Sequence, residues 1–378
     1  MNLLQKKIIF TLFVVLIFII GNQIELPIIP YETDNIPKGL NVYLFTLGIT
    51  PWMSAQILVR VIYLGREQKV SSKRNIYIYI LTLIIGMIQS LGMLSVGPSW
   101  EVLVYFILPS TVVLLAGSFI LIFIAQCNVE YGLGGQSIMF LLNILLSKKS
   151  LLSNFQNLTT SDSIAIAFIM FWSLLSIYIM VILDKAEYRI AVNRVSINSS
   201  RIKDSYVPLK LNPSGGMAFM YGFSIISLSK YLILFLSKIF SNKELFTTLS
   251  LFTDLTNWRG SLYYVIILFL MTILFTFFNF DIEEFSNNLR KTGDYLINIR
   301  PGRATQVFLK NTLLCLGVFS AFQICILVGT PLFFGYLFNF PTDIMTVPGM
   351  FLMTSGMILT MNQEIVTIRT VKEYQPLL

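Results

Sequence analysis

The side chains that usually carry catalysis are absent from this sequence or stand where they do not suit it. The 378 residues include no histidine, which excludes histidine-based triads, HExxH zinc sites and haem ligation by histidine. The three cysteines, Cys127, Cys315 and Cys325, form no CxxC pair, so their spacing argues against a disulfide or a metal site. No carboxylate or Ser–Lys group falls at mid-depth of an apolar segment. We therefore expect neither an enzyme nor a bound cofactor or metal.

Charged residues inside apolar segments would indicate an ion-coupled carrier, which usually needs carboxylates near mid-membrane. All 19 acidic residues fall in loops or at segment ends, and Glu364 comes closest to an apolar interior. Arg60 and Lys230 stand within apolar segments, each expected near a segment end, where its side chain can reach the interface. An inverted-repeat secondary carrier is the main alternative from another class, although it lacks the ionisable groups that it would need.

The composition is that of a membrane protein. Apolar residues make up 55% of the chain and charged residues 12%, about half the share that is usual in soluble domains. Several runs approach the roughly 20 apolar residues that cross a bilayer as a helix, and the alternating strands of a barrel are absent. We therefore predict an all-α, polytopic fold of ten transmembrane helices. The expected spans are residues 8–28, 43–64, 75–95, 102–126, 136–147, 163–183, 217–240, 261–280, 311–335 and 344–363.

Basic residues predict the orientation of the bundle, since Lys and Arg accumulate in cytoplasmic loops. With the N-terminus inside, 19 of the 27 Lys and Arg residues fall in cytoplasmic segments and 6 fall outside. Both termini and the two large basic loops, 184–216 and 281–310, then face the cytoplasm. This ratio of 19 cytoplasmic to 6 external basic residues also supports ten spans, because omitting one span would move every later loop to the opposite side of the membrane.

Four spans carry glycine, proline or small polar residues that lipid-facing helices avoid. They are the second, fifth, seventh and tenth, within residues 43–64, 132–147, 214–230 and 347–364. If the chain consists of two halves of five spans, residues 1–150 and 151–378, these four occupy matching positions. Paired broken spans indicate a transport pathway, although small residues can also serve close helix packing. Because the segments are lined by Met, Ile, Phe and small polar residues, the pathway suits a peptide better than a single solute.

Short strings at five places, within and beside these segments, resemble the SecY family of protein translocase channels. The strings are FTLGITPWMSAQI at 45–57, GLGGQSI at 132–138, YRIAVNR at 188–194, VPLKLNPSG at 207–215, and SNNLRKTG with IRPG at 286–293 and 299–302. Each stands in its expected topological place, and the match runs from residue 6 to about residue 370.

The resemblance implies an hourglass of ten helices in two pseudo-symmetric halves, with a ring of apolar side chains at its waist. By local alignment the ring falls on Met53, Ile57, Phe140, Ile144, Met220 and Met353. Each of these could instead be an ordinary core residue. The resemblance also implies a lateral gate between spans two and seven, flanked by spans three and eight, through which signal sequences reach lipid.

The resemblance further implies that the two large loops dock a SecA-type motor ATPase, and that a small SecE-like subunit clamps the halves. Because the sequence has no GxxxxGK[ST] motif, the chain itself is expected to be passive. Arg300, in a rigid Pro–Gly turn, is the loop residue to which we assign contact with the motor or the incoming chain. Lys210, Arg201 and Arg303 follow as further docking residues. The alternative is that these cations only enforce topology and meet anionic lipid.

The segment between Leu26 and Leu44 is shorter than the helical plug that the family usually carries there. This trimming, together with short external loops and a short tail, looks like the accessory SecY branch of Gram-positive bacteria. That branch works beside a dedicated motor and exports serine-rich, glycosylated surface proteins. We therefore expect a plasma-membrane channel for preproteins, with accessory Sec proteins as further partners and no nucleic-acid partner. A general housekeeping channel is the alternative within the family.

Overall fold

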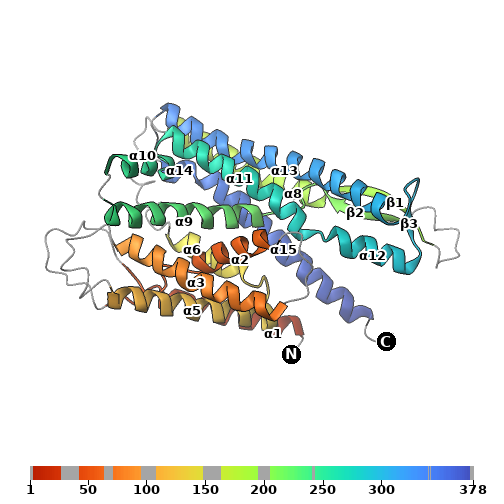
Figure 1. Ribbon diagram of the computed structural model, residues 1–378, viewed down its shortest axis with the longest axis horizontal. Helices are drawn as coiled ribbons and strands as arrows, with labels where there is room; N and C mark the ends of the chain where they lie inside the picture. The colour runs from red at the N-terminus through yellow and green to blue at the C-terminus, as the bar shows by residue number, and fades with distance from the viewer. Residues whose placement is uncertain are drawn as a thin grey trace. The chain divides into compact units, whose positions relative to one another are not determined.

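The computed structural model describes residues 3–26, 42–63, 71–94, 108–147, 163–194, 205–240, 243–338, 340 and 342–374. Each of the ten predicted spans overlaps one long or medium helix (Figure 1), and the all-α, ten-span prediction is confirmed. These helices are α1 (Leu3–Gly21), α2 (Thr50–Ile62), α3 (Ser71–Leu94), α5 (Leu108–Tyr131), α6 (Ser137–Ser147), α8 (Ser163–Lys185), α9 (Met217–Ile239), α11 (Trp258–Asn279), α13 (Arg303–Phe338) and α15 (Val347–Tyr374).

Within the described residues, seven helices are long and apolar enough to cross a membrane: α1, α3, α5, α8, α9, α11 and α13. The remaining three, α2, α6 and α15, are the spans with the weakest sequence signal. Two of them are short, since α2 has 13 residues and α6 has 11. At 1.5 Å per residue neither reaches across a hydrocarbon core of about 30 Å. Short helices with irregular flanks are tolerated at membrane depth where protein or water surrounds them.

The long loops, for which the sequence predicted no regular structure, contain a small antiparallel sheet. Its central strand is β1 (Glu187–Asn193), flanked by β2 (Tyr206–Lys210) and β3 (Tyr295–Leu296). In its register Ile190 lies opposite Val207, and Val192 lies opposite Leu296. The sheet therefore joins the 184–216 loop to the 281–310 loop, about 100 residues apart in the chain. The other short elements are α10 (Lys243–Thr253), α12 (Ile282–Thr292) and α14 (Thr342–Met345).

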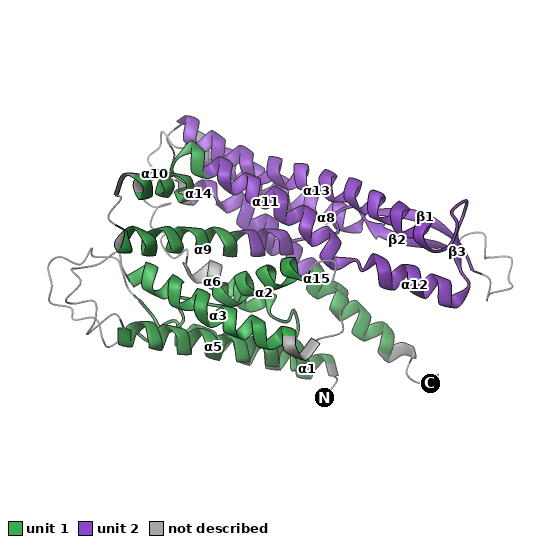
Figure 2. Ribbon diagram, in the orientation of Figure 1, with its two compact units in different colours: residues 1–158, 223–260, 360–378 green, residues 159–222, 261–359 purple. Residues whose placement is uncertain are grey.

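The chain forms two compact units (Figure 2). The first takes in residues 1–158, 223–260 and 360–378, and the second takes in residues 159–222 and 261–359. Helices α9 and α15 each contribute residues to both units. The division into halves at residue 150 concerns the order of the spans, and it stays a prediction.

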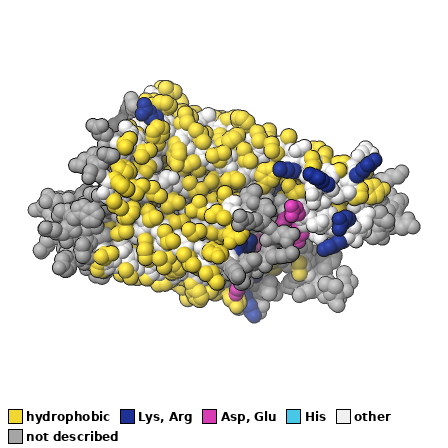
Figure 3. Space-filling model, in the orientation of Figure 1, with side chains coloured by type: hydrophobic (Ala, Val, Ile, Leu, Met, Phe, Trp, Pro, Cys, Tyr) yellow, Lys and Arg dark blue, Asp and Glu magenta, His cyan; other side chains and the backbone are white. Residues whose placement is uncertain are grey.

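Side chains are distributed as membrane helices require. Hydrophobic side chains cover the helices on the face that Figure 3 shows, whereas Lys and Arg side chains gather over α12 and the strands. On α8, the side chains of Met170, Phe171, Leu174 and Tyr178 are all more than half exposed and recur at helical spacing. A helix that exposes such a stripe needs an apolar surrounding, which a bilayer supplies.

Candidate functional site

The second predicted span enters its helix through a tight turn. Gly48 has a φ of +61°, a region that favours glycine, and a Cβ at this position would collide with the side chain of Asn143 on α6. Thr50 then opens α2, and Pro51 stands in its first turn, where a missing N–H costs no helical hydrogen bond. The first part of the predicted span, before Thr50, is therefore turn and not helix.

Within the first unit, α2 and α9 are joined by hydrogen bonds between buried polar groups. The hydroxyl oxygens of Ser54 and Ser224 lie 2.6 Å apart. The Ser224 hydroxyl also donates to the carbonyl of Thr50 at 2.8 Å, and the Ser54 hydroxyl lies 3.2 Å from the carbonyl of Ser224. All three side chains are buried. We call Thr50, Ser54 and Ser224 the α2–α9 seam, and it stands where the resemblance implies a lateral gate.

Helix α3 packs against the same seam. The hydroxyl of Thr50 lies 3.4 Å from the Oε1 of Gln89, and the Nε2 of Gln89 is buried without a hydrogen-bond partner among the described residues. A Cβ at Gly92 would collide with the backbone carbonyl of Tyr231 on α9, so the glycine permits a close approach of the two helices. Spans two, three and seven therefore meet as the resemblance implies.

The six predicted ring residues come from α2, α6, α9 and α15. Met53, Ile57, Phe140, Met220 and Met353 are each at most 1% exposed, and Ile144 lies on α6. Met53 and Ile57 are one turn apart on α2, and the ring of Phe140 meets that of Phe223 edge-on, with centroids 6.2 Å apart. The carbonyl of Met353 lies 3.2 Å from the position of a Cβ at Gly216, where the residue just before α9 packs closely against α15. Because its members belong to both units, the ring as a whole stays a prediction.

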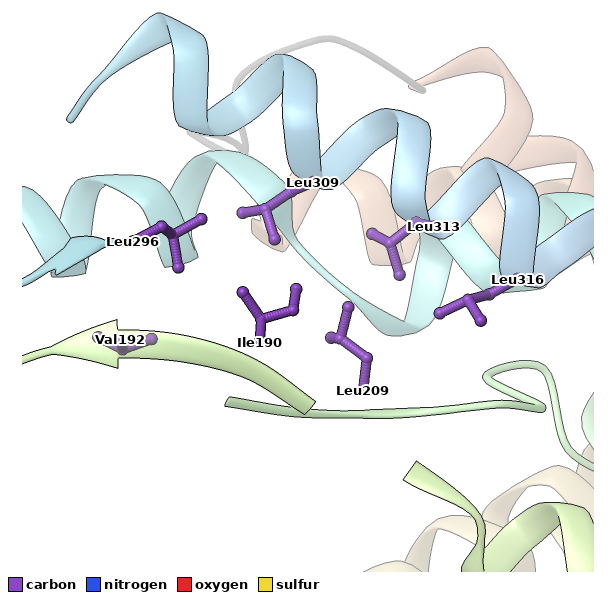
Figure 4. Close-up of a cluster of buried hydrophobic side chains, with 7 residues drawn as sticks. All are labelled: Ile190, Val192, Leu209, Leu296, Leu309, Leu313 and Leu316. Carbon is purple, nitrogen blue, oxygen red and sulfur yellow. The ribbon is translucent and has the colours of Figure 1, made fainter. Parts of the chain in front are cut away.

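In the second unit the two long loops share a hydrophobic core. Seven buried side chains from the three strands and from the first turns of α13 pack together: Ile190, Val192, Leu209, Leu296, Leu309, Leu313 and Leu316 (Figure 4). Phe285 and Leu289 of α12 pack against this cluster. We call β1, β2, β3, α12 and the part of α13 from Arg303 to Leu316 the loop module. Its core fixes segments that would otherwise be independent loops.

Helix α12 has strong local signals at both ends. The side chain of Asp281 accepts hydrogen bonds from the backbone N–H groups of Glu283 and Glu284, as an N-cap residue does. Acidic residues occupy the first turn and Arg290 and Lys291 the last, which complements the helix dipole. Gly293, with a φ of +77°, ends the helix in the left-handed conformation.

The predicted docking residues are placed differently within this module. Arg300 and Arg303 are exposed, on either side of the Pro301–Gly302 turn, where Gly302 has a φ of +105°. Two hydroxyl groups fix the turn. The hydroxyl of Thr305 donates to the carbonyl of Arg300 at 3.0 Å, and the hydroxyl of Ser286 on α12 lies 3.5 Å from the carbonyl of Gly302. Arg300 therefore projects from a rigid support.

Lys210 has a structural partner instead. Its ammonium lies 2.9 Å from the carboxylate of Asp184, which is 8% exposed at the end of α8. This ion pair ties strand β2 to the end of a membrane helix. Arg201 lies outside the residues that the structure describes, as does most of the short segment between Leu26 and Leu44, where the family usually carries a plug.

Glu364 holds a cluster that the sequence did not indicate. Its carboxylate accepts a hydrogen bond from the N–H of Gly134 at 2.9 Å and lies 3.5 Å from the ammonium of Lys7. Nearby, the hydroxyl of Thr11 accepts from the N–H of Leu133 at 2.8 Å. These contacts fix the glycine turn that precedes α6 between α1 and α15. The sequence showed only that Glu364 is an acidic residue at the end of an apolar span. Its partner Gly134 could not be predicted, because the two residues are far apart in the chain.

One expectation for the charged residues is wrong. Arg60 lies in the last turn of α2, near a helix end as predicted. Lys230, in contrast, is the fourteenth of the 23 residues of α9, close to the middle of the helix. The predicted span, 217–240, differs from the helix by one residue, so the error was to treat this position as an end.

The comparisons with known proteins agree with this arrangement. The profile of the SecY family matches residues 43–362. Two proteins described as accessory Sec system protein translocase subunit SecY2 are each 30% identical to the chain. The one from Streptococcus agalactiae serotype Ia aligns over 99% of this chain and 96% of its own length, and the one from Streptococcus pneumoniae CGSP14 over 99% and 98%.

Solved structures show the same fold. A structure described as a protein-conducting channel has a TM-score of 0.67 and 13% identity, over 97% of this chain and 93% of that one. Sec61 from a canine ribosome–channel complex has a TM-score of 0.63 and 14% identity over the same shares. With the family profile covering most of the chain and relatives aligned over nearly its full length, the chain belongs to the SecY family.

Proposed function

We propose that this chain is the protein-conducting channel of an accessory Sec translocase, which passes unfolded preproteins across the bacterial plasma membrane. The observation that carries the proposal is the α2–α9 seam within a SecY-family fold. A row of buried hydroxyl contacts between two membrane helices can open at little cost, because interhelical hydrogen bonds in membranes contribute only about 0.6 kcal/mol each. A signal sequence that replaces these contacts can separate the helices and reach lipid.

The loop module is the surface that we assign to a SecA-type motor ATPase. It presents Arg300 and Arg303 on a fixed turn, and Arg is the side chain best suited to bidentate contact with carboxylates. The chain has no nucleotide-binding motif of its own, so the work of export comes from the motor. A small SecE-like membrane subunit completes the assembly, as the family resemblance implies. The substrates of the accessory branch, serine-rich glycosylated surface proteins, are the expected cargo.

Both chain termini and the loop module face the cytoplasm in this proposal. The support is the distribution of basic residues, 19 of 27 on one side of the predicted topology. The grouping of Lys and Arg over α12 and the strands in Figure 3 is in keeping with this assignment.

Co-purification and reconstitution test the proposal. The chain is extracted in mild detergent, and the proteins that remain bound are identified by mass spectrometry. A SecA-type ATPase and a small single-span protein are expected, and the identity of the motor distinguishes an accessory from a housekeeping channel. The reconstituted complex should then protect a preprotein from external protease only when ATP is present. If the chain instead purifies alone and drives uptake of a small solute into liposomes, the proposal is wrong and a carrier is the better assignment.

A further inference from the structure

Lys230 is a charged residue at membrane depth that the seam, the ring and the loop module leave unexplained. It lies nine residues from the end of α9 at Ile239, which corresponds to about 13 Å along the helix axis. A lysine side chain has five single bonds of about 1.5 Å between Cα and Nζ and reaches about 6 Å at most. Its ammonium therefore cannot reach the helix end. A charge held at such depth against lipid is costly, so it indicates contact with water or with a partner.

The exposure of α9 argues against a lipid-facing position. From Met217 to Ser237, Lys230 is the one exposed side chain of this helix, and every other is buried or half-buried. Lipid-facing helices of this chain look different, since α8 presents a stripe of side chains such as Met170 and Leu174 that are about 60% exposed. Lys230 also forms no ion pair with any residue that the structure describes. An exposed cation on an otherwise shielded helix fits a water-filled passage.

The helical period identifies the face on which Lys230 lies. Phe223, Ser227 and Lys230 follow at spacings of four and three residues and share one face of α9. At the near end of this face the ring of Phe223 meets that of Phe140, a predicted ring residue. Ser224, which closes the seam with α2, lies on the adjacent face. Lys230 therefore stands about 10 Å beyond the Phe223–Phe140 contact, on the side of α9 that carries this contact.

We propose that Lys230 is a fixed positive charge in the passage, which contacts the passing polypeptide and favours acidic over basic segments. The inference rests on the proposed channel function. In water, Coulomb's law gives about a fourfold preference for an anion about 5 Å from a single cation, and an equal penalty for a cation. Removing the charge should then lower the ratio of chloride to potassium permeability by on the order of tenfold.

The probe is potassium chloride, applied as a gradient across planar bilayers that contain the reconstituted channel. Lys230→Gln should lower the permeability ratio, Lys230→Glu should lower it further, and Lys230→Arg should retain it. The matched control is Arg369→Gln, which removes an exposed cation from α15, away from this face and from the loop module. In motor-driven export, Lys230→Glu should slow a preprotein with an acidic segment and speed one with a basic segment at the same position.

A second measurement does not depend on conduction. In a background without Cys127, Cys315 and Cys325, Lys230→Cys should react with a charged thiol reagent, whereas Leu174→Cys on the lipid-facing stripe of α8 should not. An unchanged permeability ratio in a channel that still exports preproteins would overturn the inference alone, as would protection of Cys at position 230 from the reagent. A wild-type complex that neither conducts nor exports would overturn the proposed function and the inference with it.

Discussion

Removing the hydroxyl of Ser224 should shift the channel toward its open state. In the α2–α9 seam this hydroxyl donates to the carbonyl of Thr50 at 2.8 Å and lies 2.6 Å from the hydroxyl of Ser54. Ser224→Ala deletes both of these contacts and changes little volume, whereas the Ser54 hydroxyl keeps its contact with the backbone carbonyl of residue 224. The carbonyl of Thr50 keeps a partner, because the Ser54 hydroxyl also lies 3.1 Å from it. The effect therefore reports lost contacts between helices and not a newly unsatisfied buried group.

The expected magnitude follows from the strength of such bonds. Interhelical hydrogen bonds in a membrane average about 0.6 kcal/mol, so two of them stabilise the closed seam by about 1.2 kcal/mol. This corresponds to a shift of about eightfold in the closed-to-open ratio. A double-mutant cycle with Ser54→Ala should return a coupling of about 0.6 kcal/mol, the value of the Ser54–Ser224 contact itself.

Single-channel recording in planar bilayers measures this shift as open probability without a motor or substrate. The matched control is Ser237→Ala on the same helix, whose hydroxyl donates to the carbonyl of Leu234 one turn back at 2.7 Å. It removes a hydroxyl from α9 without touching α2. If Ser224→Ala and Ser237→Ala give the same open probability, or if the cycle is additive, the seam does not hold the channel closed.

The order and type of the membrane helices could be predicted from the sequence because each depends on local composition. Runs of apolar residues located α1, α3, α5, α8, α9, α11 and α13, and the balance of basic residues justified retaining the weaker spans. The helix ends were less accurate. α13 begins at Arg303 and continues to Phe338, whereas its predicted span starts at residue 311. The added turns place Leu309 in the core of the loop module. The length and hydropathy of a membrane span do not predict this part of the helix, because it packs against the strands.

The loop module was missed because its signals are either faint or distant. Strand β1 does alternate, with Ile190 and Val192 buried on either side of the exposed Ala191. That pattern could have indicated a half-buried strand. Strand β3 has only two residues, and its pairing with Val192 joins positions about 100 residues apart. A pairing of that kind has no local signature, and the short strand has no periodicity to detect.

Contacts within the candidate site were unpredictable for the same reason. A hydrogen bond of the α2–α9 seam joins Ser54 to Ser224, 170 residues apart in the chain. The carboxylate of Glu364 accepts a hydrogen bond from the N–H of Gly134, 230 residues away. The sequence did show that spans two and seven contain small polar residues. It could not show which of these serines meet, because that depends on helix rotation and depth. The family resemblance indicated which helices are neighbours, and the structure showed which of their atoms are in contact.

The remaining predictions concern the ring, the docking turn and the loop module. Replacing Met53, Ile57 and Phe140 by Gly or Ser should increase ion leakage through the reconstituted channel, and an unchanged leak would count against the ring. Arg300→Glu should abolish motor-driven export while membrane insertion stays normal, with Arg369→Glu on α15 as the control. Normal export in the Arg300→Glu variant would refute the assigned role.

The last prediction tests whether the loop module must be rigid to dock a motor. Leu296→Ala truncates a fully buried side chain and should destabilise the module by about 2–5 kcal/mol, because it leaves a cavity in a small core. The neighbouring Ile297→Ala, at a position that is 48% exposed, should cost much less. Hydrogen exchange of β1 and β2 should therefore accelerate in Leu296→Ala alone, and the same variant should bind the motor at least tenfold more weakly while its ion conductance is unchanged. Faster exchange with undiminished motor affinity would show that docking does not need the shared core, and unchanged exchange would show that the core does not hold the strands.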